Sequence, residues 1–179
     1  MTMSNLTGKW LLKDLVSNKI GAPKNGLNVF SCFCAGGGST MGYKLAGFSV
    51  LGGVEIDKKM ADVYSKNHSP KYLYNLGISD FNKLKQKEIP KELYSLDVLD
   101  GSPPCSSFSV SGSREKKWGE DTYFREGQEK QILDNLFFDF LETTKKLKPK
   151  VVIAENVKGI LMGKAKGYVK EILRSFEQL

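Results

Sequence analysis

Several features that would place this chain in a specialised class of protein are missing from its 179 residues. No run of about 18 apolar residues occurs, so we expect no membrane-spanning helix. The first residues lack the basic and apolar regions of a secretory signal. Three cysteines are too few for a disulfide framework and suit a reducing cytosol. A single histidine, His68, leaves little scope for a multi-histidine site, and we predict no metal.

The residues that are present have the composition of one globular domain, with 40% apolar and 26% charged residues. A chain of this length fits one domain and buries roughly 70% of its unfolded surface. The net charge of +7 is localised, because the segment from Lys145 to Arg174 holds nine basic and two acidic residues. Such a segment suits a polyanionic partner, and a solvated face is the alternative.

Apolar, strand-like segments alternate with helix-like ones along most of the chain. We predict strands over residues 27–34, 48–56, 72–76, 96–99 and 151–154. We predict helices over residues 10–16, 40–46, 58–67, 81–88 and 128–147, and from residue 164 onward. The alternation predicts an α/β fold with a doubly wound, mostly parallel sheet. Residues 1–26 are then an extension, either for docking or for DNA binding, and residues 101–127 are a long polar loop.

Glycine or polar residues follow four of the predicted strands. They are the glycines at 36–38, then Glu55, then Pro103 to Cys105, and finally Glu155 with Asn156. Because the carboxyl ends of parallel strands meet at one edge of a sheet, these clusters are expected to lie together, and this edge is where such folds bind ligands.

The glycines and Glu55 together suggest a cofactor that contains adenosine. Glycines after a first strand allow close approach to a ligand, and an acid about 20 residues later suits two ribose hydroxyls. The glycines do not form a clean G-x-G-x-x-G motif, and no phosphate-binding G-x-x-x-x-G-K motif is present. A tight turn without a ligand, and a helix-capping role for Glu55 that Asp57 fills equally well, remain the alternatives.

Cys105 has the setting of a nucleophile, since it follows two prolines and precedes polar residues. Cys32 and Cys34 lie in a predicted strand and are expected to be buried apolar residues. His68 has no sequence reason to lie near Cys105, so we interpret it as a surface or capping residue and not as a catalytic base. Glu155 is able to hold a ring nitrogen or an amine, or else is an ordinary cap at a strand end.

These motifs occur in the order and spacing of a known family, which the chain from about residue 27 to residue 174 resembles: the DNA (cytosine-5)-methyltransferases. The matching runs are DGSPPC from Asp100 to Cys105, AENVKG from Ala154 to Gly159, FCAGGGSTMG from Phe33 to Gly42, and LFF from Leu136 to Phe138 with KPK at residues 148–150.

The resemblance implies methyl transfer from S-adenosylmethionine to carbon 5 of a cytosine flipped out of double-stranded DNA. Cys105 would attack carbon 6 of the base while Glu155 holds ring nitrogen 3 and the amine. Contacts with the cofactor are implied for Phe33, Gly37, Gly38, Glu55, Ile56, Ile78, Pro104 and Leu136. Ser109 and Arg114, with the loop at 111–118, would face DNA. The resemblance also implies the sheet type of S-adenosylmethionine-dependent methyltransferases and a cytoplasmic, bacterial or phage-encoded protein of restriction–modification.

The sequence departs from the family pattern at several positions. Ser31 stands where an acid usually precedes the first motif. Gly77 stands where an Asp usually reads the adenine amine, and Asp80 would replace that Asp only if the turn differs. The family's arginine-containing motif, its target-recognition domain and its final helix do not occur by residue 179. We therefore expect residues 27–179 to be a partial catalytic domain, either truncated or half of a split enzyme with a C-terminal partner, and inactive or weakly active alone.

Two other interpretations stay open. One keeps the family but makes tRNA the substrate for cytosine-5 methylation. The other is a module that binds cofactor or nucleic acid without catalysis.

Overall fold

Five parallel strands form one sheet in the order β3-β2-β1-β4-β5. The computed structural model describes residues 25–104, 135–161 and 165–177. The strands are β1 (Asn28–Cys32), β2 (Ser49–Val54), β3 (Tyr72–Tyr74), β4 (Val98–Gly101) and β5 (Val151–Ala154). Because β1 pairs with both β2 and β4, the chain winds outward in both directions from β1. The predicted doubly wound, parallel α/β fold is confirmed.

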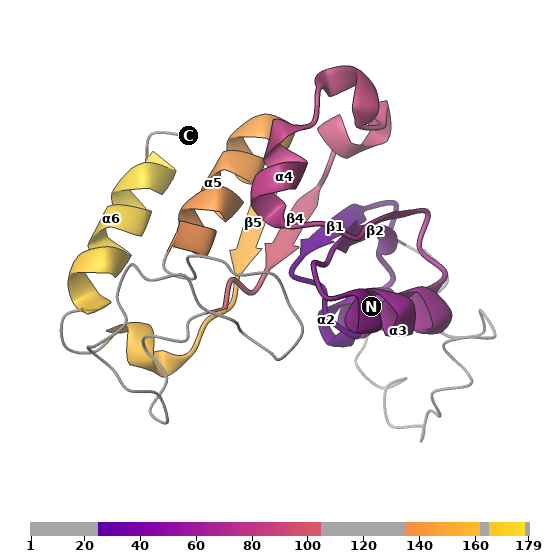
Figure 1. Cartoon of the computed structure of the whole chain (residues 1–179), viewed down its shortest axis with the longest axis horizontal. Helices are drawn as coiled ribbons and strands as arrows, with labels where there is room; N and C mark the ends of the chain where they lie inside the picture. The colour runs from indigo at the N-terminus through magenta and orange to yellow at the C-terminus, as the bar shows by residue number, and fades with distance from the viewer. Residues whose placement is uncertain (1–24, 105–134, 162–164, 178–179) are drawn as a thin grey trace.

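Helices connect successive strands and cover both faces of the sheet (Figure 1). They are α2 (Gly38–Leu45), α3 (Lys58–His68), α4 (Ile78–Lys83), α5 (Leu136–Leu147) and α6 (Ala165–Glu177). The described residues also form short 3-10 helices at η2 (Gln86–Glu88), η3 (Lys91–Tyr94) and η6 (Lys158–Leu161). In the described part of the chain, no helix is long and apolar enough to cross a membrane.

The main core lies between the sheet and the helices α4, α5 and α6. Phe30 of β1 stacks on Phe81 of α4, and Phe140 of α5 is fully buried. A β-carbon at Gly101 would lie 2.5 Å from the Phe140 ring, so this glycine allows α5 to sit close against β4. On the other face, a hydrogen bond of 2.9 Å between the hydroxyls of Thr40 and Tyr64 joins α2 to α3.

One predicted helix is wrong. The segment 81–88, predicted as a helix, is divided between the end of α4 and the separate 3-10 helix η2, with Leu84 in an extended conformation. The Lys146 ammonium of α5 donates to the carbonyls of Phe81, Asn82 and Leu84. In a longer α4, these carbonyls would instead accept hydrogen bonds from N–H groups of the next helical turn. The predicted helix 10–16 and residues 128–134 of another lie outside the described residues, while the other helices and all five strands differ only at their ends.

Candidate active site

The turn after β1 contains a left-handed residue at Gly37, a conformation that favours glycine. Gly37 has a φ of +92° and caps the start of α2. Its N–H donates to the Cys34 carbonyl at 2.9 Å, which closes the turn. A β-carbon added at Gly38 would have no atom within 4 Å, so the space beside the first residue of α2 is open. Both residues therefore fit the predicted role, one by shaping the turn and the other by leaving room.

The side chain of His68 packs against this turn. No pattern in the sequence indicates this contact. His68 is the last residue of α3, half-buried, and a β-carbon at Gly37 would lie 2.1 Å from its Nε2. Its ring packs against Tyr64. Burial, and then the Lys44 ammonium, lower the pKa of His68, so it is a neutral packing group at pH 7. The prediction of a surface or capping residue is correct only in part, because α3 folds back onto the turn and leaves His68 half-buried.

Glu55 connects the end of β2 to the same turn. One carboxylate oxygen accepts the N–H of Ala35 and the other accepts the N–H of Asp57, each at 2.8 Å. The cap of α3 is Asp57, which accepts the N–H groups of Lys59 and Met60. The two acids thus have separate roles. Asp57, and not Glu55, caps α3, so the alternative that Glu55 is the helix cap does not apply.

The segment between β3 and the start of α4 packs against the end of β2 beside Glu55. Asn75 donates to the carbonyls of Glu55 and Ile56, which holds the end of β2 in place. A β-carbon at Gly77 would lie 3.5 Å from the Ile56 side chain and 3.7 Å from a carboxylate oxygen of Asp80. The Asp80 carboxylate therefore lies beside the position of a β-carbon at residue 77.

The ends of β4 and β5 are joined by Asn156, a side chain to which the sequence assigns no separate role. Asn156 donates from Nδ2 to the carbonyl of Pro103 at 3.0 Å, which ties the Glu155 segment to the prolines before Cys105. Glu155 is exposed, and its N–H donates to the Gly101 carbonyl at 3.0 Å. Pro104 is partly buried at the last described position before Cys105. Cys105, Ser109 and Arg114 lie outside the described residues.

The three remaining predicted cofactor residues are apolar. Phe33 is half-buried with a φ of +57°, directly before the glycine turn. Ile78 and Leu136 are buried, and both belong to the main core at the first residues of α4 and α5. Their core role is clear, and their contact with a cofactor stays a prediction.

Both described cysteines are held as neutral thiols. Burial, and then the Glu55 carboxylate, raise the pKa of Cys34 to about 12. Burial also raises the pKa of Cys32 well above its ordinary value. A thiolate is the reactive form, so neither residue is suited to nucleophilic chemistry. The prediction that both cysteines are buried is confirmed.

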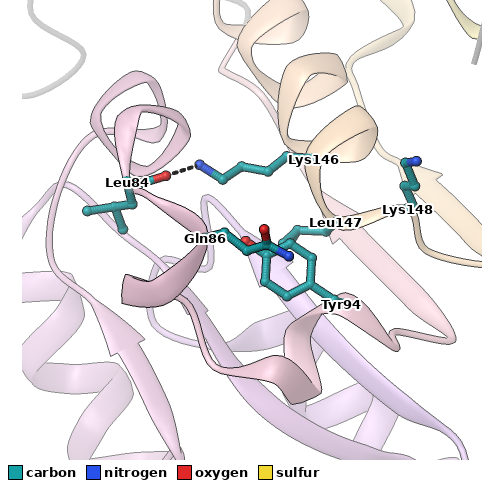
Figure 2. Close-up of a pocket in the computed structure, with 6 residues that line it drawn as sticks. All are labelled: Leu84, Gln86, Tyr94, Lys146, Leu147 and Lys148. Carbon is teal, nitrogen blue, oxygen red and sulfur yellow. Dashed lines mark hydrogen bonds between the residues drawn. The ribbon is translucent and has the colours of Figure 1, made fainter.

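A pocket of about 500 Å³ lies at the opposite edge of the sheet and is separate from these residues (Figure 2). Its lining residues precede β4 or β5 in the chain, which places the pocket at the amino ends of these strands: Leu84, Gln86, Tyr94, Lys146, Leu147 and Lys148. No residue of the predicted site contributes to it. Among the described residues, no group of three or more His, Cys, Asp or Glu is placed to hold a metal ion.

Residues 27–179 match the family model of the C-5 cytosine-specific DNA methylases. The chain belongs to this family. It is 31% identical to the type II methyltransferase M.FnuDI of Fusobacterium nucleatum and 32% identical to M.NgoPII of Neisseria gonorrhoeae, over 85% and 86% of this chain. These alignments span only 38% and 40% of the two relatives, so this methylase chain has about two fifths of their length.

Solved structures show the same fold. A prophage-encoded DNA modification methyltransferase (E. coli) superposes with a TM-score of 0.64 over 86% of this chain, at 24% identity. A SAM-dependent methyltransferase from Agrobacterium tumefaciens superposes with a TM-score of 0.53 over 92% of this chain, at 16% identity. The predicted sheet type is confirmed, and the described motif residues follow strands at the carboxyl edge of that sheet.

Proposed function

We propose that this chain forms the cofactor-binding and nucleophile-bearing part of an enzyme that methylates carbon 5 of cytosine in DNA. The observation that carries the proposal is the hydrogen bond from Asn156 to Pro103. It holds the strand end that bears Glu155 beside the segment that leads into Cys105, where the two residues would act on one base.

The edge beside β1 and β2 fits S-adenosylmethionine as the cofactor, which supplies an electrophilic methyl group when bound. The open space at Gly38 would admit its methionine part. A carboxylate can accept about four hydrogen bonds, so Glu55 would accept the ribose hydroxyls in addition to the backbone amides that it holds. Phe33, Ile56, Ile78, Pro104 and Leu136 would supply apolar contacts.

Asp80 would read the exocyclic amine of the adenine in place of the Asp that the family usually has at position 77. One of its oxygens lies 3.7 Å from the position of a β-carbon at Gly77, and the other pairs with Lys83. Asp80→Ala should weaken cofactor binding about tenfold, while Asp62→Ala, which removes a similar exposed ion pair on α3, should leave it unchanged. Equal effects of the two changes on the dissociation constant would contradict this role.

The chemistry would begin at Cys105. Its thiolate forms a bond to carbon 6 of a flipped cytosine while Glu155 hydrogen-bonds ring nitrogen 3 and the amine, so that carbon 5 becomes nucleophilic. Carbon 5 would then take the methyl group as its bond to the sulfonium sulfur breaks, which would leave a neutral thioether. Removal of the proton from carbon 5 and elimination of the cysteine sulfur restore the aromatic base and the free enzyme.

DNA would contact the loop that contains Ser109 and Arg114 and part of the basic segment 145–174. Three lysines of that segment already have internal partners: Lys145 pairs with Glu142, Lys150 with Asp97, and Lys146 caps α4. Phosphate contacts would therefore fall on the others, and a basic surface of this kind suits a cytoplasmic DNA-binding enzyme.

A C-terminal segment or partner would complete the enzyme along β5. Val151 and Glu155 donate their N–H groups to β4, so the backbone groups of Val152 and Ala154 point to the other edge, where no described strand pairs with them. Val151, Ile153 and Val157 are 51%, 43% and 46% exposed. Parallel sheets are normally covered on both faces, which suggests that further polypeptide belongs here.

A covalent trap tests the proposal directly. Duplex DNA with 5-fluorocytosine should form an adduct with the chain plus a C-terminal methylase segment, and Cys105→Ala should abolish it. Methyl transfer to duplex DNA and to tRNA, measured side by side, decides the substrate. An adduct that persists in Cys105→Ala, or transfer only to tRNA, would overturn the proposal.

A further inference from the structure

Asp100 is a buried acid that the proposed chemistry does not use. It is 5% exposed and lies near the end of β4, opposite Ser31 of β1 in the parallel register. One carboxylate oxygen accepts the Ser31 hydroxyl at 3.1 Å, and the other accepts the Tyr43 hydroxyl at 3.2 Å. The Asp100 side chain is formally anionic, and each of its two oxygens is paired with one hydroxyl.

No cation balances this charge in the described part of the chain. Its five ion pairs do not include Asp100, and the two donors to Asp100 are neutral hydroxyls. A buried charge without an opposite charge is costly to keep, since the interior solvates it poorly. Two hydroxyls offset only part of that cost.

The position of Asp100 connects it to the ligand-binding edge. Ser31 lies two residues before Phe33, and Tyr43 comes from α2, which begins at the glycine turn. The negative charge of Asp100 also contributes to the raised pKa of Cys34, directly before that turn. The carboxylate thus joins β1 to α2, the two elements on either side of the turn, so its charge would act on a ligand bound at that turn.

We propose that Asp100 favours the positively charged methyl donor over the product left after methyl transfer. This inference rests on the proposed cofactor. S-adenosylmethionine carries a sulfonium, an ammonium and a carboxylate, which gives a net charge of +1. Loss of the methyl group leaves a neutral thioether, and the net charge falls to zero. A buried anion therefore attracts the substrate cofactor more strongly than its product.

Ligand binding to the chain tests this without any need for turnover. The dissociation constants of S-adenosylmethionine and S-adenosylhomocysteine are measured by calorimetry for the wild type and for Asp100→Asn. We expect the ratio of the two constants to move about tenfold in favour of the product, which is about 1.4 kcal/mol. Asp97→Asn is the matched control, because Asp97 is a buried acid at the other end of β4 that already pairs with Lys150. It should leave the ratio unchanged.

Two further variants separate charge from folding. Tyr43→Phe removes a hydrogen bond and keeps the carboxylate, so it should preserve the ratio. The single variant Asp100→Ser should lose the preference for S-adenosylmethionine. The double variant S31D/D100S places the carboxylate at residue 31, which lies opposite residue 100 on β1, and should restore that preference. Equal weakening of both ligands in Asp100→Asn, or a loss of the ratio in Tyr43→Phe, would overturn the inference. A wild-type chain that binds neither ligand would overturn the proposed cofactor, and this inference with it.

Discussion

At the scale of single residues, several side chains at the carboxyl ends of the strands form hydrogen bonds with backbone groups of the neighbouring loops. Glu55 holds the amides of Ala35 and Asp57, Asn75 holds two carbonyls at the end of β2, and Asn156 holds Pro103. Each of these bonds fixes the path of a loop between a strand and a helix. The described residues at this edge therefore hold one another in place, and such preorganisation would lower the entropic cost of binding the proposed cofactor.

Gly37 provides a direct test of this organisation. Gly37→Ala should destabilise the fold by about 2 to 4 kcal/mol, because a left-handed conformation and overpacking against His68 both oppose a β-carbon. Urea unfolding measures the loss. Gly38→Ala is the control: with open space around it and a helical conformation, it should change stability by less than about 0.5 kcal/mol. Similar losses in the two variants would contradict the argument.

At the scale of elements, one acid connects three strands at the amino edge of the sheet. Asp97 accepts the N–H of Asn28 on β1 at 2.8 Å and the Lys150 ammonium, directly before β5, at 2.7 Å. The Lys150 ammonium, and then the Asn28 amide, lower the pKa of Asp97 below its ordinary value. The ionised form is therefore bound more strongly in the folded chain than in the unfolded one.

This contact should make part of the stability depend on pH. Because the folded-state pKa is lowered, the contribution is complete above the unfolded value of about 3.9 and is lost as the pH falls through the folded value. The difference in urea midpoint between wild type and Asp97→Asn should be largest near pH 7 and shrink below about pH 4. Asp62→Asn, in an exposed ion pair, should show little difference at any pH. A difference for Asp97→Asn that persists unchanged at pH 3 would refute the account.

At the scale of the whole molecule, the open side of the sheet at β5 should govern association. An exposed apolar strand edge promotes pairing between chains. Ile153→Lys should therefore reduce concentration-dependent self-association in sedimentation experiments. Val63→Lys on α3 is the control, because Val63 is 40% exposed against 43% for Ile153 but does not lie on a strand edge. Equal effects of the two changes would show that the edge has no special role.

The same open side leads us to expect that residues 1–179 alone transfer methyl groups weakly. Glu155, at the end of β5, is exposed, and a charge in water stabilises a bound base less than one in a dry site. Methyl transfer to duplex DNA should rise at least a hundredfold when a C-terminal methylase segment is supplied. Full activity of the chain by itself would contradict this expectation.

Much of the fold could be predicted because its signals are local. Short runs such as Val151–Ala154 are apolar and β-branched, and each is bounded by glycine, proline or charge. The error over residues 81–88 has a different origin. Lys146, more than sixty residues away, supplies the donors that end α4, and no local pattern contains that information.

The order of strands and helices is readable in the amino-acid sequence, since it follows from periodicity and from residues that lie close together in the chain. The family is readable there too, because its motifs resemble those of known proteins in residues, order and spacing. Which residues support one another across the sheet became visible only in the folded molecule. His68 beneath Gly37, and Asp100 between Ser31 and Tyr43, are neighbours in space but separated in sequence. Their contacts depend on parallel register and helix packing, which arise only when the whole sheet assembles.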